Sequence, residues 1–506
     1  MQIKNMLPTF LLIAVLLGIF LGCKQNAEKT ANADQKETES AEETYTKPRV
    51  PDWHKNANIY EVNLRHYTSE GTFKAFEKHV ARLKDMGVDI LWFMPIHEIS
   101  KTKRKGGLGS PYAVNDYKDV NPDFGTMDDF KHMLKVIHDA GMYCLIDWVP
   151  NHTGWDNKWI TEHPDWYTKG KDGKITDPIN YDTGESWGWT DVADLNYDNK
   201  EMRKGMIDAL AFWIKDVGID GFRVDVAHGV PVDFWVESSD ALYDIEPVFM
   251  LAEAEVAELR NNGSFIMDYA WEMHHLLNDI AKARGANQKE AAKLVQGNKV
   301  EGGQSDEHTK NATDIDSLLA KMNKRSPEGY AMQFTSNHDE NSWAGTEMER
   351  MGPGHKAFAV LTATFNGMPL IYTGQESAMN KQLKFFEKDE IDWGDYPYAG
   401  FYKKLLSLKH RNKALWNGKH GGELVKIPTG KDEMVYAFYR EKEGDKVVVI
   451  INLSGDKQSV ELDSENIKGD YRNVMEDETT VIASLTKGTK MTMEPWSYMV
   501  LELEQK

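Results

Sequence analysis

Cysteine is scarce in this chain, which has 506 residues but only two cysteines, Cys23 and Cys144. Two cysteines exclude both a disulfide scaffold and a cysteine-rich zinc site. Positive charge is in deficit as well, because 60 Lys and Arg residues are set against 80 Asp and Glu residues, which gives a net charge of −20. A chain this acidic is a poor candidate for binding the phosphate backbone of nucleic acids. We therefore expect no nucleic-acid partner.

The N-terminal apolar run, residues 7–21, is shorter than the ~20 residues that a membrane-spanning helix needs. It follows Lys4 and is typical of an export signal, which we place at residues 1–22. The signal ends in Phe20-Leu21-Gly22-Cys23, which resembles a bacterial lipobox except that Phe20 stands where Leu is usual. The resemblance implies a lipid on Cys23 and a protein anchored by it in the bacterial cell envelope, at a periplasmic face or an outer surface. An ordinary signal peptide with a chance Cys is the alternative.

Residues 23–50 are polar, rich in Glu, Lys, Thr and Ala, and without an apolar period, which is typical of a flexible tether.

In the chain as a whole, 41% of the residues are hydrophobic and 11% are aromatic, enough to bury large cores. Cys144 lies in an apolar run and is expected to be an inert core thiol. At roughly 100–200 residues per domain, the length suggests about three domains.

From residue 57 onward, short apolar strands alternate with amphipathic helices. This order predicts a parallel sheet with helices outside it, and eight such strands predict a closed (β/α)8 TIM barrel at residues 51–151 and 199–414. The predicted strands are residues 59–62, 90–94, 142–147, 221–226, 248–252, 264–268, 331–335 and 368–372.

The alternation is interrupted after the third strand. Residues 152–198 contain five Trp and little periodicity, which predicts an inserted domain, domain B, at the C-terminal end of that strand. After residue 415, strand-like runs follow one another without helices between them, at residues 435–439, 447–453 and 497–501. This pattern predicts a C-terminal antiparallel β-sandwich domain at residues 415–506.

Carboxylates stand at the predicted C-terminal ends of four strands, in residues 147–152, 221–228, 252–255 and 334–339. Barrel enzymes hold their catalytic groups at these ends. Two close carboxylates repel, so that one keeps a proton and the other stays ionised. Retaining glycoside hydrolysis needs such a pair, about 5–5.5 Å apart, and the many Trp and Tyr can pack against sugar rings. A catalytic metal is the main alternative, but it usually needs two or three His with a carboxylate.

Taken together, the four segments resemble the four signature regions of the α-amylase family of glycoside hydrolases. The flanking sequences agree, because Tyr112 with Asp116-Tyr117, residues 194–196 and residues 367–376 are similar to further segments of that family. The resemblance runs from about residue 50 to the C-terminus.

The resemblance implies a role for each residue of the site. Asp225 is expected to be the nucleophile, Glu253 the general acid and then base, and Asp339 the third carboxylate, which holds the sugar hydroxyls. Arg223 stands two residues before Asp225 on the same strand face, and its charge is expected to keep Asp225 ionised. Three further residues are expected to bind the sugar at the cleavage site: Tyr112 by stacking, and His152 and His338 by hydrogen bonds.

Two positions depart from the pattern of the family. Its members often have Lys-His at the third and fourth positions after the nucleophile, where this chain has His228 and Gly229. His228 is expected to serve the sugar past the scissile bond. The calcium site of the family often uses the Asn that matches Asn151, together with an Asp where Asn196 stands. Because calcium prefers charged oxygens, a structural calcium ion at Asn151 stays open, while the chemistry itself is expected to need no cofactor.

The implied function is a retaining hydrolase that cleaves α-1,4-glucosidic bonds of starch or maltooligosaccharides by double displacement. The same signature residues occur in neopullulanases, cyclodextrinases, exo-α-glucosidases and glycosyl-transferring relatives. Endo or exo action and α-1,4 or α-1,6 preference therefore stay open. A non-catalytic, sugar-binding member is disfavoured because Asp225, Glu253 and Asp339 are all present.

Overall fold

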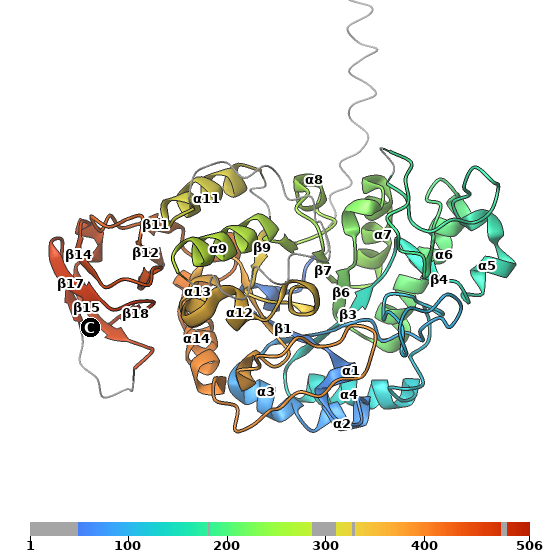
Figure 1. The fold of residues 1–506 in the computed structure, drawn as a ribbon, viewed down its shortest axis with the longest axis horizontal. Helices are drawn as coiled ribbons and strands as arrows, with labels where there is room; N and C mark the ends of the chain where they lie inside the picture. Colours follow the sequence, from blue (N-terminus) through green and yellow to red (C-terminus); the bar gives the residue numbers. More distant parts are fainter. Residues whose placement is uncertain (1–48, 181–182, 286–309, 326–328, 477–482, 506) are drawn as a thin grey trace, which may run out of the picture. The chain divides into compact units, whose positions relative to one another are not determined.

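The computed structural model describes residues 49–180, 183–285, 310–325, 329–476 and 483–505 (Figure 1). The predicted signal, most of the tether and the lipobox at Cys23 lie outside these ranges, so that the lipid anchor stays a prediction. Within the ranges, no helix is both long enough and apolar enough to cross a membrane.

Eight parallel strands close into a barrel in the order β1-β10-β9-β8-β7-β6-β3-β2. The predicted (β/α)8 barrel is therefore confirmed. Its strands are β1 (Ile59–Val62), β2 (Ile90–Phe93), β3 (Tyr143–Trp148), β6 (Gly221–Val224), β7 (Phe249–Ala252), β8 (Met267–Tyr269), β9 (Tyr330–Gln333) and β10 (Met368–Tyr372). The largest difference from prediction is at β8, which begins at Met267 instead of residue 264. The Phe265 N–H donates to the backbone oxygen of Leu259 at 3.1 Å, instead of to a neighbouring strand, and so the strand begins later.

Alternate residues of the barrel strands point inward and form two chemical layers. One layer is a hydrophobic cluster that includes Ile59, Leu145 and Leu251. Glu61 lies two residues after Ile59 on its strand, and Asp147 lies two residues after Leu145. Both carboxylates therefore point inward as well, and both are fully buried. The inward-pointing residues are thus apolar in the middle of the barrel and ionisable towards its C-terminal end, where the candidate site lies.

Helices surround the barrel (Figure 1). Their starts follow local signals: Thr126 and Asp129 form a capping box at α4, and Asn199 caps α6. The helices are α1 (Leu64–Tyr67), α2 (Phe73–Glu77), α3 (Val80–Met86), α4 (Met127–Asp139), α6 (Lys200–Phe212), α7 (Val232–Ile245), α8 (Ala257–Asn261), α9 (Trp271–Ala283), α11 (Thr313–Arg325), α12 (Glu347–Met351), α13 (His355–Thr364) and α14 (Ala399–Arg411).

The segment between β3 and α6 leaves the barrel and returns to it through two short paired strands. These are β4 (His152–Gly154) and β5 (Val192–Asp194), which pair antiparallel, with α5 (Trp159–Glu162) between them. The pairing places His152 opposite Asp194. His152 therefore lies at the base of the inserted segment, next to the strand end that carries Asp147.

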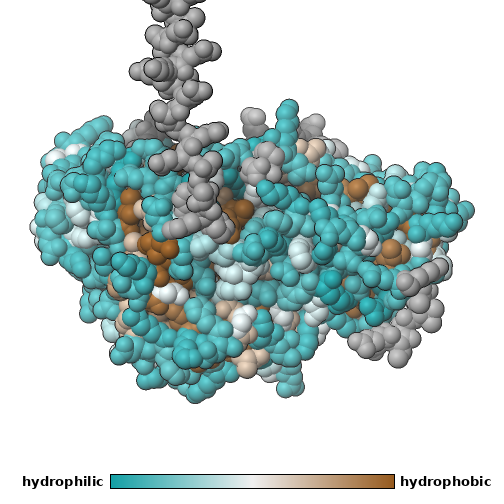
Figure 2. Space-filling view, turned by 180° about the vertical axis from the view of Figure 1, so that it is seen from behind, coloured by the Kyte–Doolittle hydropathy of each residue, from teal (hydrophilic) through white to brown (hydrophobic). Residues whose placement is uncertain are grey.

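The C-terminal part of the described chain is an antiparallel domain, as predicted. A six-stranded sheet has the order β11-β12-β13-β18-β15-β16, and a two-stranded sheet pairs β14 with β17. The bounds are β11 (Leu424–Lys426), β12 (Val435–Lys442), β13 (Asp445–Asn452), β14 (Gln458–Leu462), β15 (Gly469–Asn473), β16 (Ala483–Leu485), β17 (Thr489–Met493) and β18 (Tyr498–Leu503). On β12, Tyr436 and Phe438 pack with helices of the barrel, whereas Val435 and Ala437 pack with residues of the smaller sheet. The face drawn in Figure 2 is mostly hydrophilic, with hydrophobic side chains gathered in a few patches.

Candidate active site

The C-terminal ends of the barrel strands bring the three predicted carboxylates together. Asp225 follows β6, Glu253 follows β7, and Asp339 lies in the segment after β9. Their side chains differ in access to solvent: that of Asp225 is 10% exposed, that of Glu253 15%, and that of Asp339 37%. Asp339 is thus the most open of the three and the one placed to meet the hydroxyl groups of a substrate first.

Arg223, fully buried on β6, lies at the centre of this carboxylate cluster. Its Nη1 donates to Asp147 Oδ1 at 2.8 Å and to Asp225 Oδ1 at 3.0 Å. Its Nη2 lies 3.0 Å from Glu253 Oε1. One guanidinium therefore bridges the predicted nucleophile and the predicted acid. Such a bridge favours the gap of about 5–5.5 Å that retaining enzymes have over the gap of about 6.5–9.5 Å that inverting enzymes need.

Glu253 is held from a second side by a strained backbone. Val226 has a φ of 43° and a ψ of 44°, a left-handed conformation that a β-branched residue rarely adopts. In this conformation its N–H donates to Glu253 Oε2 at 2.8 Å. The strain costs of the order of 1–3 kcal/mol, and its position directly after the nucleophile indicates that it serves to orient the acid. No pattern in the sequence indicates this strained conformation.

His338 forms a charged chain of hydrogen bonds across the barrel mouth. Its Nδ1 lies 2.6 Å from Glu61 Oε1, and its Nε2 lies 2.7 Å from Tyr112 Oη. Tyr112 Oη in turn donates to Asp147 Oδ2 at 3.1 Å. Burial alone lowers the pKa of His338, but the carboxylates of Asp339 and Glu61 raise it to about 9. The imidazole is therefore protonated at neutral pH, and both of its nitrogens donate.

The ionisation of Asp225 depends on its burial and on its charged neighbours. Burial and the neighbouring Glu253 raise the pKa of Asp225, and Arg223 offsets only part of this rise, so that the pKa lies well above the ordinary range. Burial likewise raises the pKa of Asp147 to about 6. Arg223 lowers the pKa of Asp225, as expected, but burial and Glu253 act against it, and the expectation that Arg223 keeps Asp225 ionised stays a prediction. The carboxyl groups titrate as a coupled set, and the raised pKa values of Asp147 and Asp225 favour retention of a proton within this set, which general acid catalysis requires.

The predicted sugar-binding residues also lie in this region. Burial lowers the pKa of His152 to about 4, so that its imidazole is neutral. Tyr112 is only 8% exposed, and its ring stacks on His338 and on Phe385, with centroids 5.5 Å and 6.2 Å away. Only a small part of the Tyr112 ring is thus open to a sugar. His228 is exposed, and its Nδ1 lies 3.4 Å from the backbone oxygen of Glu253.

Two buried carboxylates of the site were given no role in the prediction: Asp147, which stands in one of the four carboxylate-bearing segments, and Glu61, which stands in none of them. Glu61 holds His338, and Asp147 holds Arg223 and Tyr112. The signal that could have found them is the strand period, because each stands two residues after an apolar residue of the barrel interior, Ile59 and Leu145. A carboxylate that continues an inward apolar row must meet a partner inside the barrel.

The residues around Asn151 fit a calcium ion poorly. The Asn151 backbone oxygen accepts from Leu195 N–H at 3.2 Å. The Asn196 side-chain oxygen accepts from Asp198 N–H at 3.0 Å and is thereby used in a turn. Among the described residues, no three His, Cys, Asp or Glu side chains converge as a metal site requires. Calcium prefers charged oxygens, whereas these two oxygens are neutral and each already accepts a hydrogen bond.

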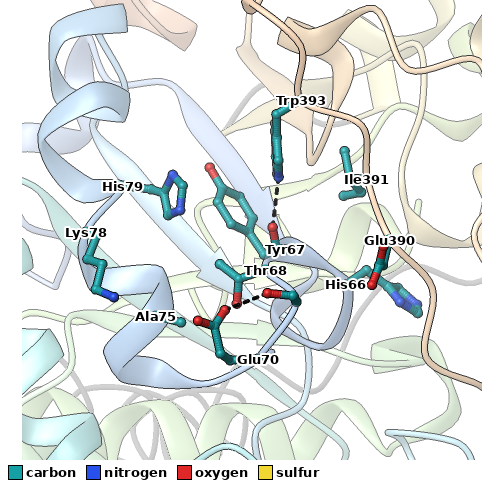
Figure 3. Close-up of a pocket in the computed structure, with 11 residues that line it drawn as sticks. His66, Tyr67, Thr68, Glu70, Ala75, Lys78, His79, Glu390, Ile391 and Trp393 are labelled. Atoms are coloured by element: carbon teal, nitrogen blue, oxygen red, sulfur yellow. Dashed lines mark hydrogen bonds between the residues drawn. The ribbon is translucent and has the colours of Figure 1, made fainter.

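A separate pocket of about 330 Å³ lies beside α1 and α2, against the segment that carries Trp393 (Figure 3). Trp393 Nε1 donates to the backbone oxygen of Tyr67 at 2.9 Å, which closes one side of it. Polar and ionisable side chains line much of the rest, among them His66, Lys78 and Glu390. No residue of the carboxylate cluster lines this pocket, so it is not the candidate active site.

Family models match both parts of the chain. The model described as the α-amylase catalytic domain matches residues 31–395, and the model of the C-terminal domain of the α-amylase SusG matches residues 435–500. The chain is 26% identical over 455 residues to the α-amylase MalA of Haloarcula japonica, an alignment that covers 85% of this chain but only 60% of MalA. It is 25% identical over 412 residues to an oligo-1,6-glucosidase of Parageobacillus thermoglucosidasius, with 70% of each chain covered.

Solved structures are similar over most of the chain. A maltogenic α-amylase, AmyB, from Thermotoga neapolitana has a TM-score of 0.75 and 25% identity, and covers 89% of this chain and 99% of its own. An α-amylase from Lactobacillus plantarum has a TM-score of 0.71 and 27% identity, with 89% and 99% covered. Both similarities include the barrel that carries the carboxylate cluster.

Proposed function

The chain belongs to the α-amylase family of glycoside hydrolases, and on this premise we propose that it is a retaining hydrolase of α-1,4-glucosidic bonds in starch or maltooligosaccharides. The observation that carries the proposal is the buried Arg223, whose guanidinium lies 3.0 Å from both Asp225 and Glu253. Two carboxyl groups that are held close together by the same guanidinium group suit double displacement. The relatives described as amylases and glucosidases support the choice of an α-glucan as substrate.

In the first step, Asp225 attacks the anomeric carbon while Glu253 gives its proton to the oxygen of the leaving sugar. The bond from the anomeric carbon to that oxygen breaks, and a glycosyl ester with Asp225 forms. In the second step, Glu253 takes a proton from water, and the water oxygen displaces Asp225. Two inversions at the same carbon give net retention.

The surrounding residues serve these steps by charge and position. Arg223 stays positive and counters the negative charge that Asp225 must carry to attack the anomeric carbon. The partly exposed Asp339 offers an acceptor to the sugar hydroxyls, and protonated His338 lies beside it, with its Nε2 3.4 Å from Asp339 Oδ2. His228, whose Nδ1 lies 3.4 Å from the Glu253 backbone oxygen, serves the sugar past the scissile bond. None of these roles requires a cofactor.

Proton NMR of the product in the first minutes of reaction tests the mechanism. We expect the α anomer to appear first, because retention preserves the configuration of the substrate. An initial β signal would indicate inversion and would contradict the roles of Asp225 and Glu253. Chromatography of the products from amylose, pullulan and cyclodextrin then distinguishes an endo-acting amylase from a neopullulanase, a cyclodextrinase, an exo-α-glucosidase and a glycosyl-transferring enzyme. Absence of turnover on all three would leave a sugar-binding protein.

We propose no cofactor for the chemistry and treat a calcium ion at Asn151 as a question of stability alone. Support comes from the donor set, in which Asn196 replaces a carboxylate. Unfolding with and without a calcium chelator tests this directly. An unchanged melting temperature would speak against the ion, whereas a clear drop would show that the folded protein binds calcium.

We also propose a lipid at Cys23 and a place in the bacterial cell envelope. The support is the sequence Phe20-Leu21-Gly22-Cys23 after an apolar run of export-signal length. Growth with a labelled palmitate analogue should mark the wild-type protein and leave Cys23→Ser unmarked and released from membranes. If Cys23→Ser still carried label and stayed in the membrane fraction, the anchor would have to be elsewhere.

A further inference from the structure

Two tryptophans of the inserted segment expose large parts of their indole rings. Trp187 is 55% exposed and Trp189 is 36% exposed. Their ring centroids lie 6.2 Å apart with an angle of 24° between the planes, so that the rings stack. Large apolar side chains that gather on a surface commonly mark a binding site, because leaving them in water is unfavourable. The pair therefore needs an explanation that the fold alone does not provide.

The tryptophan pair continues directly from the candidate active site. The ring centroid of Trp189 lies 5.9 Å from that of His152, in an edge-on contact. His152 is 4% exposed and lies at the strand end next to the carboxylate cluster. The aromatic rings thus form a row that begins at the candidate active site with His152, continues through Trp189 and ends in solvent with Trp187.

Several contacts fix the segment that carries the row. Lys105 Nζ lies 2.8 Å from Asp191 Oδ1 and donates to the backbone oxygen of Gly188 at 3.3 Å. Trp155 Nε1 donates to the backbone oxygen of Thr190 at 3.1 Å. Gly188 has a φ of 78°, which brings the two tryptophans to a turn that residues with a side chain rarely form. A surface held in this way loses little conformational entropy when a ligand binds.

We propose that Trp187 and Trp189 form a binding platform for glucosyl units of an α-glucan chain, beyond the sugar that occupies the cleavage site at His152. The apolar faces of glucose rings pack on flat aromatic side chains, and a row of two indoles suits successive units of one chain. The occupant is the substrate itself because the row is continuous with His152. This inference rests on the proposed function and adds to it a preference for chains of several units.

The test compares a long and a short substrate in the full-length enzyme. KM and kcat are measured for maltoheptaose and for p-nitrophenyl α-maltoside with wild type, Trp187→Ala and Trp187→Phe. For Trp187→Ala we expect the KM for maltoheptaose to rise about fivefold relative to the KM for the short substrate. Trp187→Phe keeps an aromatic face and should recover most of this difference. Val425→Ala serves as the control, because Val425 is 39% exposed on β11 of the C-terminal sheet, and it should leave the ratio unchanged.

The proposal is overturned if Trp187→Ala leaves the ratio of the two KM values unchanged, or if Trp187→Phe behaves like Trp187→Ala while both remain folded by circular dichroism. If the wild type hydrolyses neither substrate, the proposed function fails. The proposed binding platform is then tested by measuring binding alone. Calorimetric titration with maltoheptaose then supports the platform if Trp187→Ala binds more weakly than wild type. Equal affinities in that titration refute it.

Discussion

Replacing Glu61 by Gln should lower the pKa of His338, because it removes the carboxylate that lies 2.6 Å from His338 Nδ1. Burial lowers the pKa of this imidazole, and Asp339 and Glu61 reverse the effect and raise it to about 9. An opposite charge at such a distance shifts a pKa by about 1–3 units. In Glu61→Gln, His338 should therefore titrate about 1–3 units lower than in wild type, in or near the neutral range.

The same shift predicts how stability depends on pH. The rise in the pKa of His338 from 6.5 to about 9 corresponds to about 3 kcal/mol in favour of the imidazolium form in the folded state. Because the folded pKa lies above the unfolded one, this contribution is complete below pH 6.5 and is lost as the pH rises from 6.5 through about 9. Burial also raises the pKa of Glu61. At acidic pH the ion pair is therefore lost because Glu61 takes up a proton.

NMR of histidine labelled with carbon-13 at Cε1 measures the titration directly. The His338 resonance is assigned as the one that disappears in His338→Gln, and its midpoint should lie near pH 9 in wild type. Glu340→Gln is the matched control, since Glu340 Oε2 lies 2.9 Å from His274 Nε2 and serves a different histidine. If the midpoint were the same in Glu61→Gln and wild type, the conclusion that the Glu61 carboxylate raises the pKa of His338 would be refuted.

The barrel could be predicted from the sequence because its signal is repeated eight times. Each strand is a short apolar run followed by a helical pattern, so that an error in one element leaves the count intact. The boundary at β8 was wrong because Phe265 is apolar, but its backbone N–H donates to Leu259 instead of to a neighbouring strand. Hydrophobicity shows that a residue is buried, but it does not show where its backbone finds a hydrogen-bond partner.

The three carboxylates could be predicted because they stand at strand ends, whereas their electrostatics could not. The pKa of Asp225 depends on burial and on Glu253, which follows another strand. Distances between strands are fixed by the closure of the barrel, and no local pattern encodes them. The strained Val226 is a similar case, because its φ of 43° becomes visible only in the folded chain.

Three further predictions concern stability and the two catalytic carboxyl groups. Arg440→Met should lower the free energy of unfolding by about 3 kcal/mol or more in urea titrations, because three buried backbone carbonyls and one partly buried carbonyl lose this donor; a change below about 1 kcal/mol would show that water replaces the guanidinium. Asp225→Asn should abolish turnover of amylose while maltoheptaose still binds in calorimetry, because an amide keeps the volume but is no anionic nucleophile, and substantial residual turnover would remove Asp225 from that role. Glu253→Gln should reduce the hydrolysis of unactivated maltooligosaccharides far more than that of a 2,4-dinitrophenyl glycoside, since the acidic phenol leaves without a proton donor in the first step. Equal losses on both substrates would mean that the proton comes from another group of the coupled set, and the raised pKa of Asp339, whose largest cause is burial, would make that residue the next candidate.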